Sequence, residues 1–259
     1  MTTTRSRLVR RDFPSGAHTY SLDGRRCPGV TTIVGASSPK GALIGWAARL
    51  AAEWAVANLD TREALGDRDF FAKASKASEE VRDARADFGR DVHAAADALA
   101  DGKEISVPPD VAAYARHIID FLNTWRAKVL ARECLVWHSG HRYAGQFDVI
   151  ADLADGNRWL IDYKTGSGVY PDAALQLAAY RNAEFIVWDG QDRKMPVVNR
   201  TGVLHVHENG WDLIPVDTGP EVWACFLSAI PLYRFHGTKY GYDRLGDPIP
   251  PPAELEGVQ

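Results

Sequence analysis

Cysteine is scarce in this sequence, and long apolar runs are absent. Only 3 of the 259 residues are cysteine, and Cys27, Cys134 and Cys225 form no Cys-x-x-Cys pair. Their spacing argues against a disulfide framework and against a cysteine-bound metal cluster. No stretch approaches the ~20 apolar residues that a membrane span requires, and the first residues lack the apolar segment of a signal peptide. We therefore expect a protein of the reducing cytoplasm with no membrane partner.

An excess of one charge is also missing. The 30 Lys and Arg residues stand against 34 Asp and Glu residues, which gives a formal net charge of −4 at pH 7. Any contact with nucleic acid therefore needs a local basic patch. The sequence has no Gly-x-x-x-x-Gly-Lys-Ser/Thr loop either, so we expect no ATP site. With 46% hydrophobic and 25% charged residues, the composition is that of an ordinary globular domain.

Hydrophobic periodicity predicts an α/β fold with a small central mixed sheet flanked by helices, and with extra helices near the N-terminus. A short strand pair opens the chain, helical spacing of apolar residues follows, and strand-like alternation begins near residue 134. The expected helices are 40–58, 61–73, 78–100, 108–131, 171–184 and 220–233. The expected strands are 17–22, 134–138, 142–153, 158–165, 203–207 and 211–216.

One predicted strand carries an acid and a base on the same face. Alternation within 161–165 puts Asp162 and Lys164 on one side, about 7 Å apart at their Cα atoms. The length of the preceding loop decides whether Asp148 joins them. A two-residue loop would turn its carboxylate to the other face. A three-residue loop, 154–156 with Gly156 left-handed, places Asp148 directly across from Asp162.

Two carboxylates at that separation repel each other unless one is protonated or a cation lies between them. We expect a hard divalent cation, Mg²⁺ or Mn²⁺, because oxygen ligands with open positions for water and phosphate suit these ions. Such a site serves phosphodiester hydrolysis. The alternative is a surface hairpin whose Asp148, Asp162 and Lys164 are merely solvated.

Several motifs follow one another in a fixed order. They are Gly89-Arg-Asp-Val-His93, Gly145-Gln-Phe-Asp148, Asp162-Tyr-Lys164-Thr-Gly and Gln176-Leu-Ala-Ala-Tyr180, with Pro28-Gly-Val-Thr-Thr-Ile33 upstream. This order resembles that of the PD-(D/E)XK nuclease superfamily, in its RecB-like and phage exonuclease branch. The resemblance covers roughly residues 20 to 185 and implies a restriction-endonuclease-like core.

The resemblance also implies a role for each matched residue. Asp148, Asp162 and Lys164 would be catalytic, with Lys164 positioning or deprotonating the attacking water. The metal ligands would be Asp148, Asp162, the Tyr163 carbonyl and His93. A histidine on an alanine-rich helix is otherwise a packed or solvated residue, so its place in the motif order carries that assignment.

Substrate contacts are expected from the helix after the catalytic strand and from a turn beside it. Gln176 and Tyr180 stand four residues apart on one helix face. The resemblance implies that they hold the substrate strand or the lysine. They could equally be buried under the sheet. Arg142 would contact substrate phosphates. Glu133 reads as a surface glutamate and is left out of the expected site.

We therefore expect a single nuclease domain over 1–259. Its parts are an N-terminal hairpin and helices (1–77), a catalytic core (78–207), a C-terminal hairpin and helix (208–236) and an irregular tail (237–259). The expected activity is a divalent-metal-dependent DNA exonuclease of phage-type recombination, replication or repair, in the host cytoplasm if a phage encodes it. Its partners would be DNA and a single-strand annealing or recombination protein. The alternatives are a catalytically silent nuclease-fold binding protein and a structure-specific endonuclease.

Overall fold

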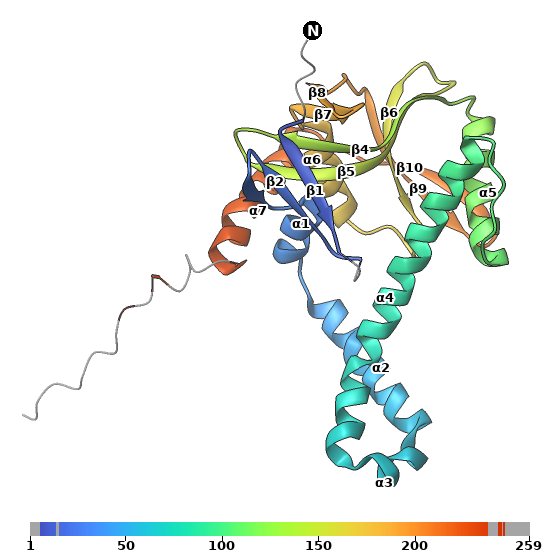
Figure 1. Cartoon of the computed structure of the whole chain (residues 1–259), viewed down its shortest axis with the longest axis vertical. Helices are drawn as coiled ribbons and strands as arrows, with labels where there is room; N and C mark the ends of the chain where they lie inside the picture. The colour runs from blue at the N-terminus through green and yellow to red at the C-terminus, as the bar shows by residue number, and fades with distance from the viewer. Residues whose placement is uncertain (1–5, 14–15, 238–242, 245, 247–259) are drawn as a thin grey trace, which may run out of the picture.

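The computed structural model describes residues 6–13, 16–237, 243–244 and 246, so nearly all of the tail expected at 237–259 lies outside the described residues. Its strands form a three-stranded sheet, β1-β2-β3, and a seven-stranded sheet, β10-β9-β6-β5-β4-β7-β8 (Figure 1). In the large sheet β6 and β9 run parallel and the other neighbours run antiparallel, so this sheet is mixed. The strands are β1 (Leu8–Asp12), β2 (His18–Leu22), β3 (Arg25–Cys27), β4 (Lys128–His138), β5 (Tyr143–Asp152), β6 (Arg158–Lys164), β7 (Phe185–Trp188), β8 (Gln191–Lys194), β9 (Arg200–His207) and β10 (Gly210–Pro215).

Two hydrophobic clusters join helices to the large sheet. The first, the α6-side cluster, contains Ile33 of α1, Leu177 of α6 and Phe226 of α7. The second, the α4-side cluster, contains Val92 of α4 and Phe121 of α5. The predicted α/β fold with a central mixed sheet flanked by helices is therefore confirmed. The helices are α1 (Val30–Ser37), α2 (Gly41–Ala57), the 3₁₀ helix η1 (Leu59–Thr61), α3 (Arg62–Leu65), α4 (Asp67–Ala100), α5 (Pro109–Thr124), α6 (Asp172–Arg181) and α7 (Pro220–Gly237).

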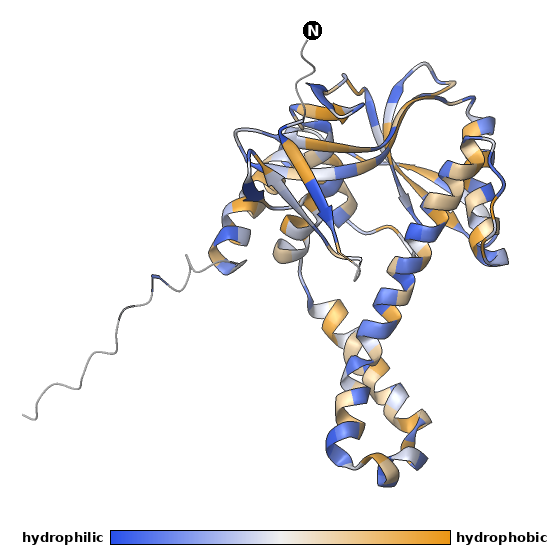
Figure 2. Cartoon of the chain, in the orientation of Figure 1, coloured by the Kyte–Doolittle hydropathy of each residue, from blue (hydrophilic) through white to orange (hydrophobic). Residues whose placement is uncertain are grey.

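Helix α4 is longer than the sequence pattern predicted, and its first half forms an arm with α2 and α3 (Figure 1). Separate helices at 61–73 and 78–100 were expected. Ala74 and Ala77 are buried and are good helix formers, so nothing interrupts the helix between those ranges. No described residue of α2 is buried, and Figure 2 shows apolar residues along much of this helix. No helix among the described residues is both long and apolar enough to cross a membrane.

Helix α5 ends seven residues before the predicted end at 131, and β4 begins at Lys128. Arg126 is left-handed with φ 47°. The Ala127 amide donates to the Leu122 carbonyl at 2.8 Å, and the Arg126 amide donates to the Asn123 carbonyl at 3.0 Å. These two bonds form a Schellman motif, which ends a helix. The apolar residues after it pack as a strand.

The hairpin between β5 and β6 has the three-residue loop that the sequence predicted. The Leu153 amide donates to the Asn157 carbonyl at 3.0 Å, Gly156 has φ 78°, and Val149 lies across from Ile161. The sequence pattern also predicts that the odd-numbered residues from Tyr143 to Leu153 share one face of the strand, and this prediction is wrong. Phe147 belongs to the α6-side cluster, whereas Val149 belongs to the α4-side cluster.

The backbone of β4 explains this change of face. The pairs Arg132 with Val149 and Cys134 with Phe147 flank Glu133, which is left-handed with φ 50°. A left-handed residue interrupts the regular pleat, so the side chains on either side of it no longer alternate simply. The odd-numbered residues of β5 therefore move from the α6-side cluster to the α4-side cluster at the level of Glu133 and Asp148.

Candidate functional site

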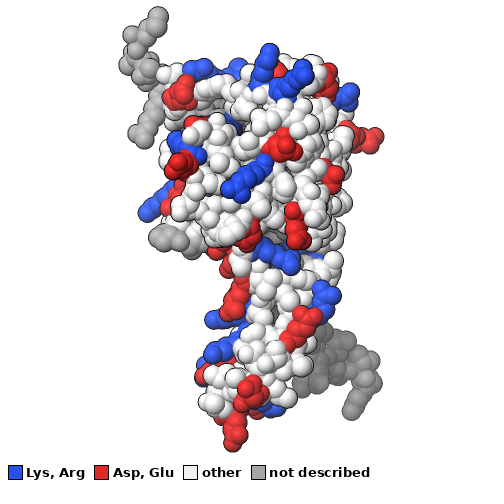
Figure 3. Space-filling view, turned by 90° about the vertical axis from the view of Figure 1, so that its right-hand side faces the viewer, with Lys and Arg blue, Asp and Glu red and all other residues white. Residues whose placement is uncertain are grey.

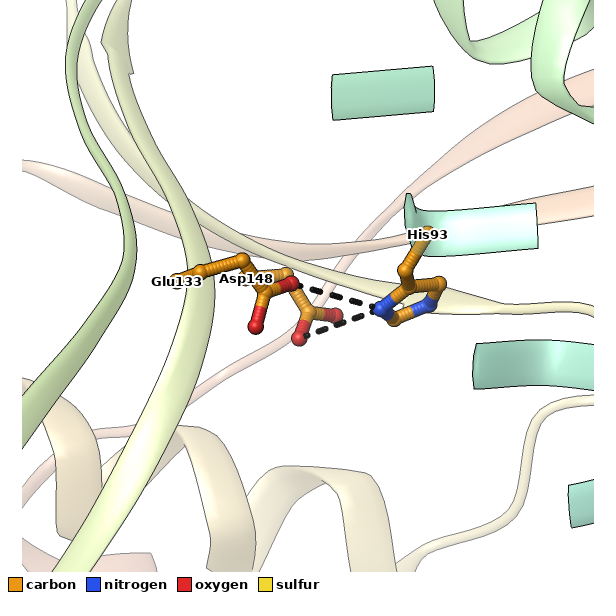
Figure 4. A group of neighbouring side chains, drawn as sticks. All are labelled: His93, Glu133 and Asp148. Carbon is orange, nitrogen blue, oxygen red and sulfur yellow. Dashed lines mark ion pairs between the residues drawn. The ribbon is translucent and has the colours of Figure 1, made fainter. Parts of the chain in front are cut away.

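Acidic groups of β4 and β5 meet a histidine of α4 at the level of Glu133 and Asp148 (Figure 4). His93 Nδ1 lies 3.5 Å from Glu133 Oε1 and 3.7 Å from Asp148 Oδ1. One potential ligand atom of each residue lies within 4.8 Å of the other two. Since bonds from a metal to oxygen or nitrogen measure about 2.0–2.6 Å, one cation could contact all three. We call these residues the His93–Glu133–Asp148 cluster.

Glu133 is held in its left-handed conformation by a side chain of the facing strand. Gln146 Nε2 donates to the Glu133 carbonyl and to Glu133 Oε2, both at 2.9 Å. Arg10 of β1 donates in turn to Gln146 Oε1. A residue of the three-stranded sheet therefore holds Gln146 in place, and Gln146 in turn orients the Glu133 carboxylate.

Asp148 connects the cluster to the strand that carries Asp162 and Lys164. The Tyr163 amide donates to Asp148 Oδ2 at 2.5 Å. Burial and, after it, the charge of Asp162 raise the pKa of Asp148 to about 7. Asp162 is therefore close enough for its charge to oppose ionisation of Asp148, as expected for two residues that face each other across the hairpin.

His93 balances this negative charge. Burial lowers the pKa of His93, but Asp148 and Glu133 raise it by more, and the result is about 9. Its ring also lies edge-on to Tyr163, with centroids 5.5 Å apart. Without a metal the imidazolium is the cation of the cluster, and a metal ligated by this ring would displace its proton.

Asp162 forms a second arrangement, on the α6 side of β6. It is only 2% exposed, and its Oδ2 lies 2.6 Å from Lys164 Nζ. Gln176 Nε2 donates to its Oδ1 at 2.8 Å, and Lys164 donates to Gln176 Oε1 at 3.4 Å. Burial lowers the pKa of Lys164, but Asp162 and Asp148 raise it above its ordinary value. The lysine is therefore a fixed ammonium at this site.

Tyr180 lies beneath this arrangement and not at a surface. It is 2% exposed, and its hydroxyl lies 3.2 Å from Gln176 Nε2. Its ring also covers Gly145, where an added Cβ would come within 2.5 Å of Tyr180 Cε1. Of the roles expected for Gln176 and Tyr180, the contacts therefore favour orientation of the lysine and of Asp162 over direct contact with a substrate.

The structure brings together most of the expected site residues, but not Arg142. That residue lies in the turn before β5 and donates to the Leu22 carbonyl at 3.4 Å. It precedes Asp148 by six residues along an extended strand, or about 20 Å. The expected ligands His93 and Asp148 share the cluster. Asp162 pairs with Lys164 beside them, and Tyr163 contacts Asp148 through its amide.

Glu133 is the site residue that sequence reasoning missed. The expected strand began at Cys134, which left Glu133 outside the sheet. In the observed register, which pairs His138 with Tyr143, Glu133 lies opposite Asp148. The expected strands, 134–138 and 142–153, would instead pair His138 with Arg142, so no signal in the sequence marked this position.

Comparisons with known proteins give no functional assignment. No protein-family model matches the chain, and no curated protein matches it. Among solved structures, a crystal structure of a protein named SSO0001 aligns with a TM-score of 0.29 and 13% sequence identity. The alignment covers 48% of this chain and 59% of that chain, so it spans less than two thirds of the other protein. A likeness at this level carries no argument about function.

Proposed function

We propose that this protein is a divalent-metal-dependent deoxyribonuclease with a restriction-endonuclease-like core, acting as an exonuclease. One observation carries the proposal. Asp162 and Lys164 share one face of β6, and the Tyr163 amide between them binds Asp148 of the His93–Glu133–Asp148 cluster. Strand β6 thus carries the Lys164 ammonium on one side and contacts the His93–Glu133–Asp148 cluster on the other.

The donor set fits a hard divalent cation. Asp148 and Glu133 offer carboxylate oxygens and His93 an imidazole nitrogen, and the buried Asp162 Oδ2 lacks a hydrogen bond with good geometry. Carboxylates suit Mg²⁺ and Mn²⁺, and an imidazole ligand is more usual for Mn²⁺. Such an ion, when bound, lowers the pKa of a water molecule and offsets charge on a phosphate.

The protein's own groups would orient the reaction. Gln176 contacts both Asp162 and Lys164, so it fixes the direction of the ammonium group. A preorganised ammonium near the attacking water stabilises hydroxide and the negative charge that develops on the phosphate. Tyr180 holds Gln176 from below.

Digestion of DNA with and without free ends tests this function. End-labelled linear duplex, single-stranded DNA and a closed circle are incubated with Mg²⁺ or Mn²⁺. We expect shortening of a linear substrate and an intact circle. A cut circle would favour the endonuclease alternative. No cleavage of any substrate over a range of pH would contradict the nuclease function and favour a silent binding protein.

A matched variant separates chemistry from metal binding. Lys164→Ala removes the ammonium but none of the proposed ligands, so we expect cleavage to fall at least about 100-fold, the scale of a lost electrostatic contact in catalysis. Calorimetry with Mn²⁺ should give an affinity close to that of the unaltered protein. Cleavage that survives this substitution would contradict the assigned role of Lys164.

A further inference from the structure

A groove of about 580 Å³ lies beside the catalytic strand, and the reaction proposed above leaves it unused. Its walls come from α4, α5, the loop after β6 and the end of β9. The side chains that matter here are Arg85, Phe88, Tyr114, Ser167, His205 and His207. Its volume falls within the range of about 300–1,000 Å³ that is usual for small-ligand sites.

The sheet topology puts this groove where ligands commonly bind. The parallel strands β6 and β9 both end at it, with Lys164 paired to His205 in the register. In α/β sheets, ligands bind in the crevice outside the carboxyl ends of parallel strands. Thr165, Gly166 and Ser167, the three residues after Lys164, contribute to the wall. A chain of nucleotides at Lys164 would therefore have the groove within reach.

The lining combines positive charge with aromatic surface. Arg85 is exposed on α4 and lies over the Trp46 ring at 5.9 Å. Phe88 and Tyr114 pack edge to face, with centroids 5.1 Å apart. Basic and aromatic side chains together are the usual lining of sites that hold single-stranded nucleic acid.

The charges that surround the groove favour a phosphate. His205 Nε2 lies 2.9 Å from the Gly166 carbonyl, which fixes its ring in the wall. His207 faces a carboxylate, with Nε2 3.4 Å from Asp212 Oδ2. Acidic residues are absent from the described lining itself. Among the described residues, no carboxylate forms an ion pair with Arg85. The Arg85 guanidinium therefore gives the groove its positive charge.

We propose that this groove holds the single-stranded DNA segment adjoining the bond that is cut. Its phosphates lie against Arg85 and the loop at Ser167, and a base lies on the wall formed by Phe88 and Tyr114. The identity of the ligand as DNA rests on the proposed nuclease function. The location of the site rests on the groove and on the strand ends.

Binding without cleavage tests the proposal. Lys164→Ala protein is titrated against a fluorescein-labelled single-stranded dT oligonucleotide in Mg²⁺, and anisotropy is followed at several salt concentrations. In this background Arg85→Gln should weaken binding about fivefold or more and reduce the slope of log K against log salt by about 0.7, the loss of one phosphate contact. The control is Arg82→Gln, an exposed arginine of the same helix that does not line the groove. It should change binding less than about twofold, as a surface charge outside the contact does.

A second pair of variants isolates charge from shape. Ser167→Glu and Ser167→Gln add side chains of nearly equal size to an exposed loop residue. The glutamate should bind the oligonucleotide about tenfold more weakly than the glutamine, because like charges repel at short range. Circular dichroism checks that each variant folds.

The outcomes separate this proposal from the nuclease function. Oligonucleotide affinity that stays within twofold in both Arg85→Gln and Ser167→Glu would overturn the groove site, and so would a protein that binds no single-stranded DNA. Groove-dependent binding by a wild-type protein that cuts nothing would leave the site standing and contradict the nuclease. If the wild-type protein cleaves DNA but neither substitution changes oligonucleotide binding, the nuclease function would stand and the groove site would be contradicted.

Discussion

At the scale of single residues, Glu133 decides which ligands the candidate site contains. Positive φ is uncommon for a residue other than glycine, and such conformations concentrate at functional sites. Here φ is 50°, and Gln146 satisfies both the carbonyl and the carboxylate of Glu133. The backbone conformation and the direction of the carboxylate therefore depend on a single neighbouring amide group.

Replacing Gln146 with alanine should therefore weaken metal binding while the ligands themselves remain. Loss of a group that orients a ligand commonly reduces metal affinity about 10–100-fold, and we expect a loss in that range for Gln146→Ala. Calorimetry with Mn²⁺ measures it. Gln191→Ala, on strand β8 at the edge of the large sheet, is the control and should leave affinity unchanged. Equal affinities for the two variants would show that Gln146 does not position Glu133.

Gly145 is a residue whose importance depends on close packing. An added Cβ would come within 2.5 Å of the Tyr180 ring, which is buried in the core. Gly145→Ala should therefore destabilise the protein by about 1–3 kcal/mol, the usual cost of overpacking a core. Gly35→Ala is the matched control, since this exposed glycine of α1 has nothing within 4 Å of an added Cβ. Urea unfolding should show it to be neutral or stabilising by up to about 1 kcal/mol, and equal destabilisation of both variants would contradict the packing argument.

At the scale of secondary-structure elements, local chemistry decided which features could be predicted. The β5–β6 hairpin followed from Gly156, because glycine takes the left-handed position of a three-residue loop. That loop length correctly paired the two strands. The end of α5 could not be predicted in this way, since its left-handed residue is Arg126 and no glycine marks it. Trp125 and Val129 fit a helical stripe, although Val129 belongs to β4.

The lack of a local sequence signal also explains why Glu133 was missed and why β7 and β8 were not expected. A strand assigned from Cys134 onward could not include a ligand one residue before it. Strands β7 and β8 have four residues each, too few to establish an alternating pattern. What remained outside prediction therefore included short strands and irregular backbone, and the irregular backbone at Glu133 completes the cluster.

Arg126 gives a test of the helix end. A left-handed residue with a side chain carries a steric cost that glycine avoids, although glycine loses more entropy on folding. Arg126→Gly should therefore stabilise the protein by about 0.5–1 kcal/mol. Arg116→Gly, inside α5, should destabilise it by about 1 kcal/mol. Thermal unfolding of both variants measures the difference, and a loss of stability in both would argue against a Schellman end at Arg126.

At the scale of the whole molecule, α4 joins two regions of different character. Its C-terminal half carries His93 and packs against the large sheet, with Val92, Ala95 and Ala96 buried. Its N-terminal half packs against α2 and α3 in the arm. On the face that carries α5, shown in Figure 3, basic and acidic side chains are interspersed, so this face has no broad field of one sign. Recognition of a polyanion on this face must therefore be local.

This division predicts two levels of local stability along the chain. Exposed helices with few buried contacts open at low free energy, whereas core strands open only with the whole domain. Amide hydrogen exchange followed by mass spectrometry should therefore show fast exchange in α2 and slow exchange in β5 and β6. Since a ligand that binds only the folded state stabilises the region it joins, Mn²⁺ should slow exchange around His93 and Asp148 and leave α2 unchanged. Slowing that spreads equally into α2 would mean that the arm and the sheet open as one unit, and the absence of any slowing near His93 would count against the metal site.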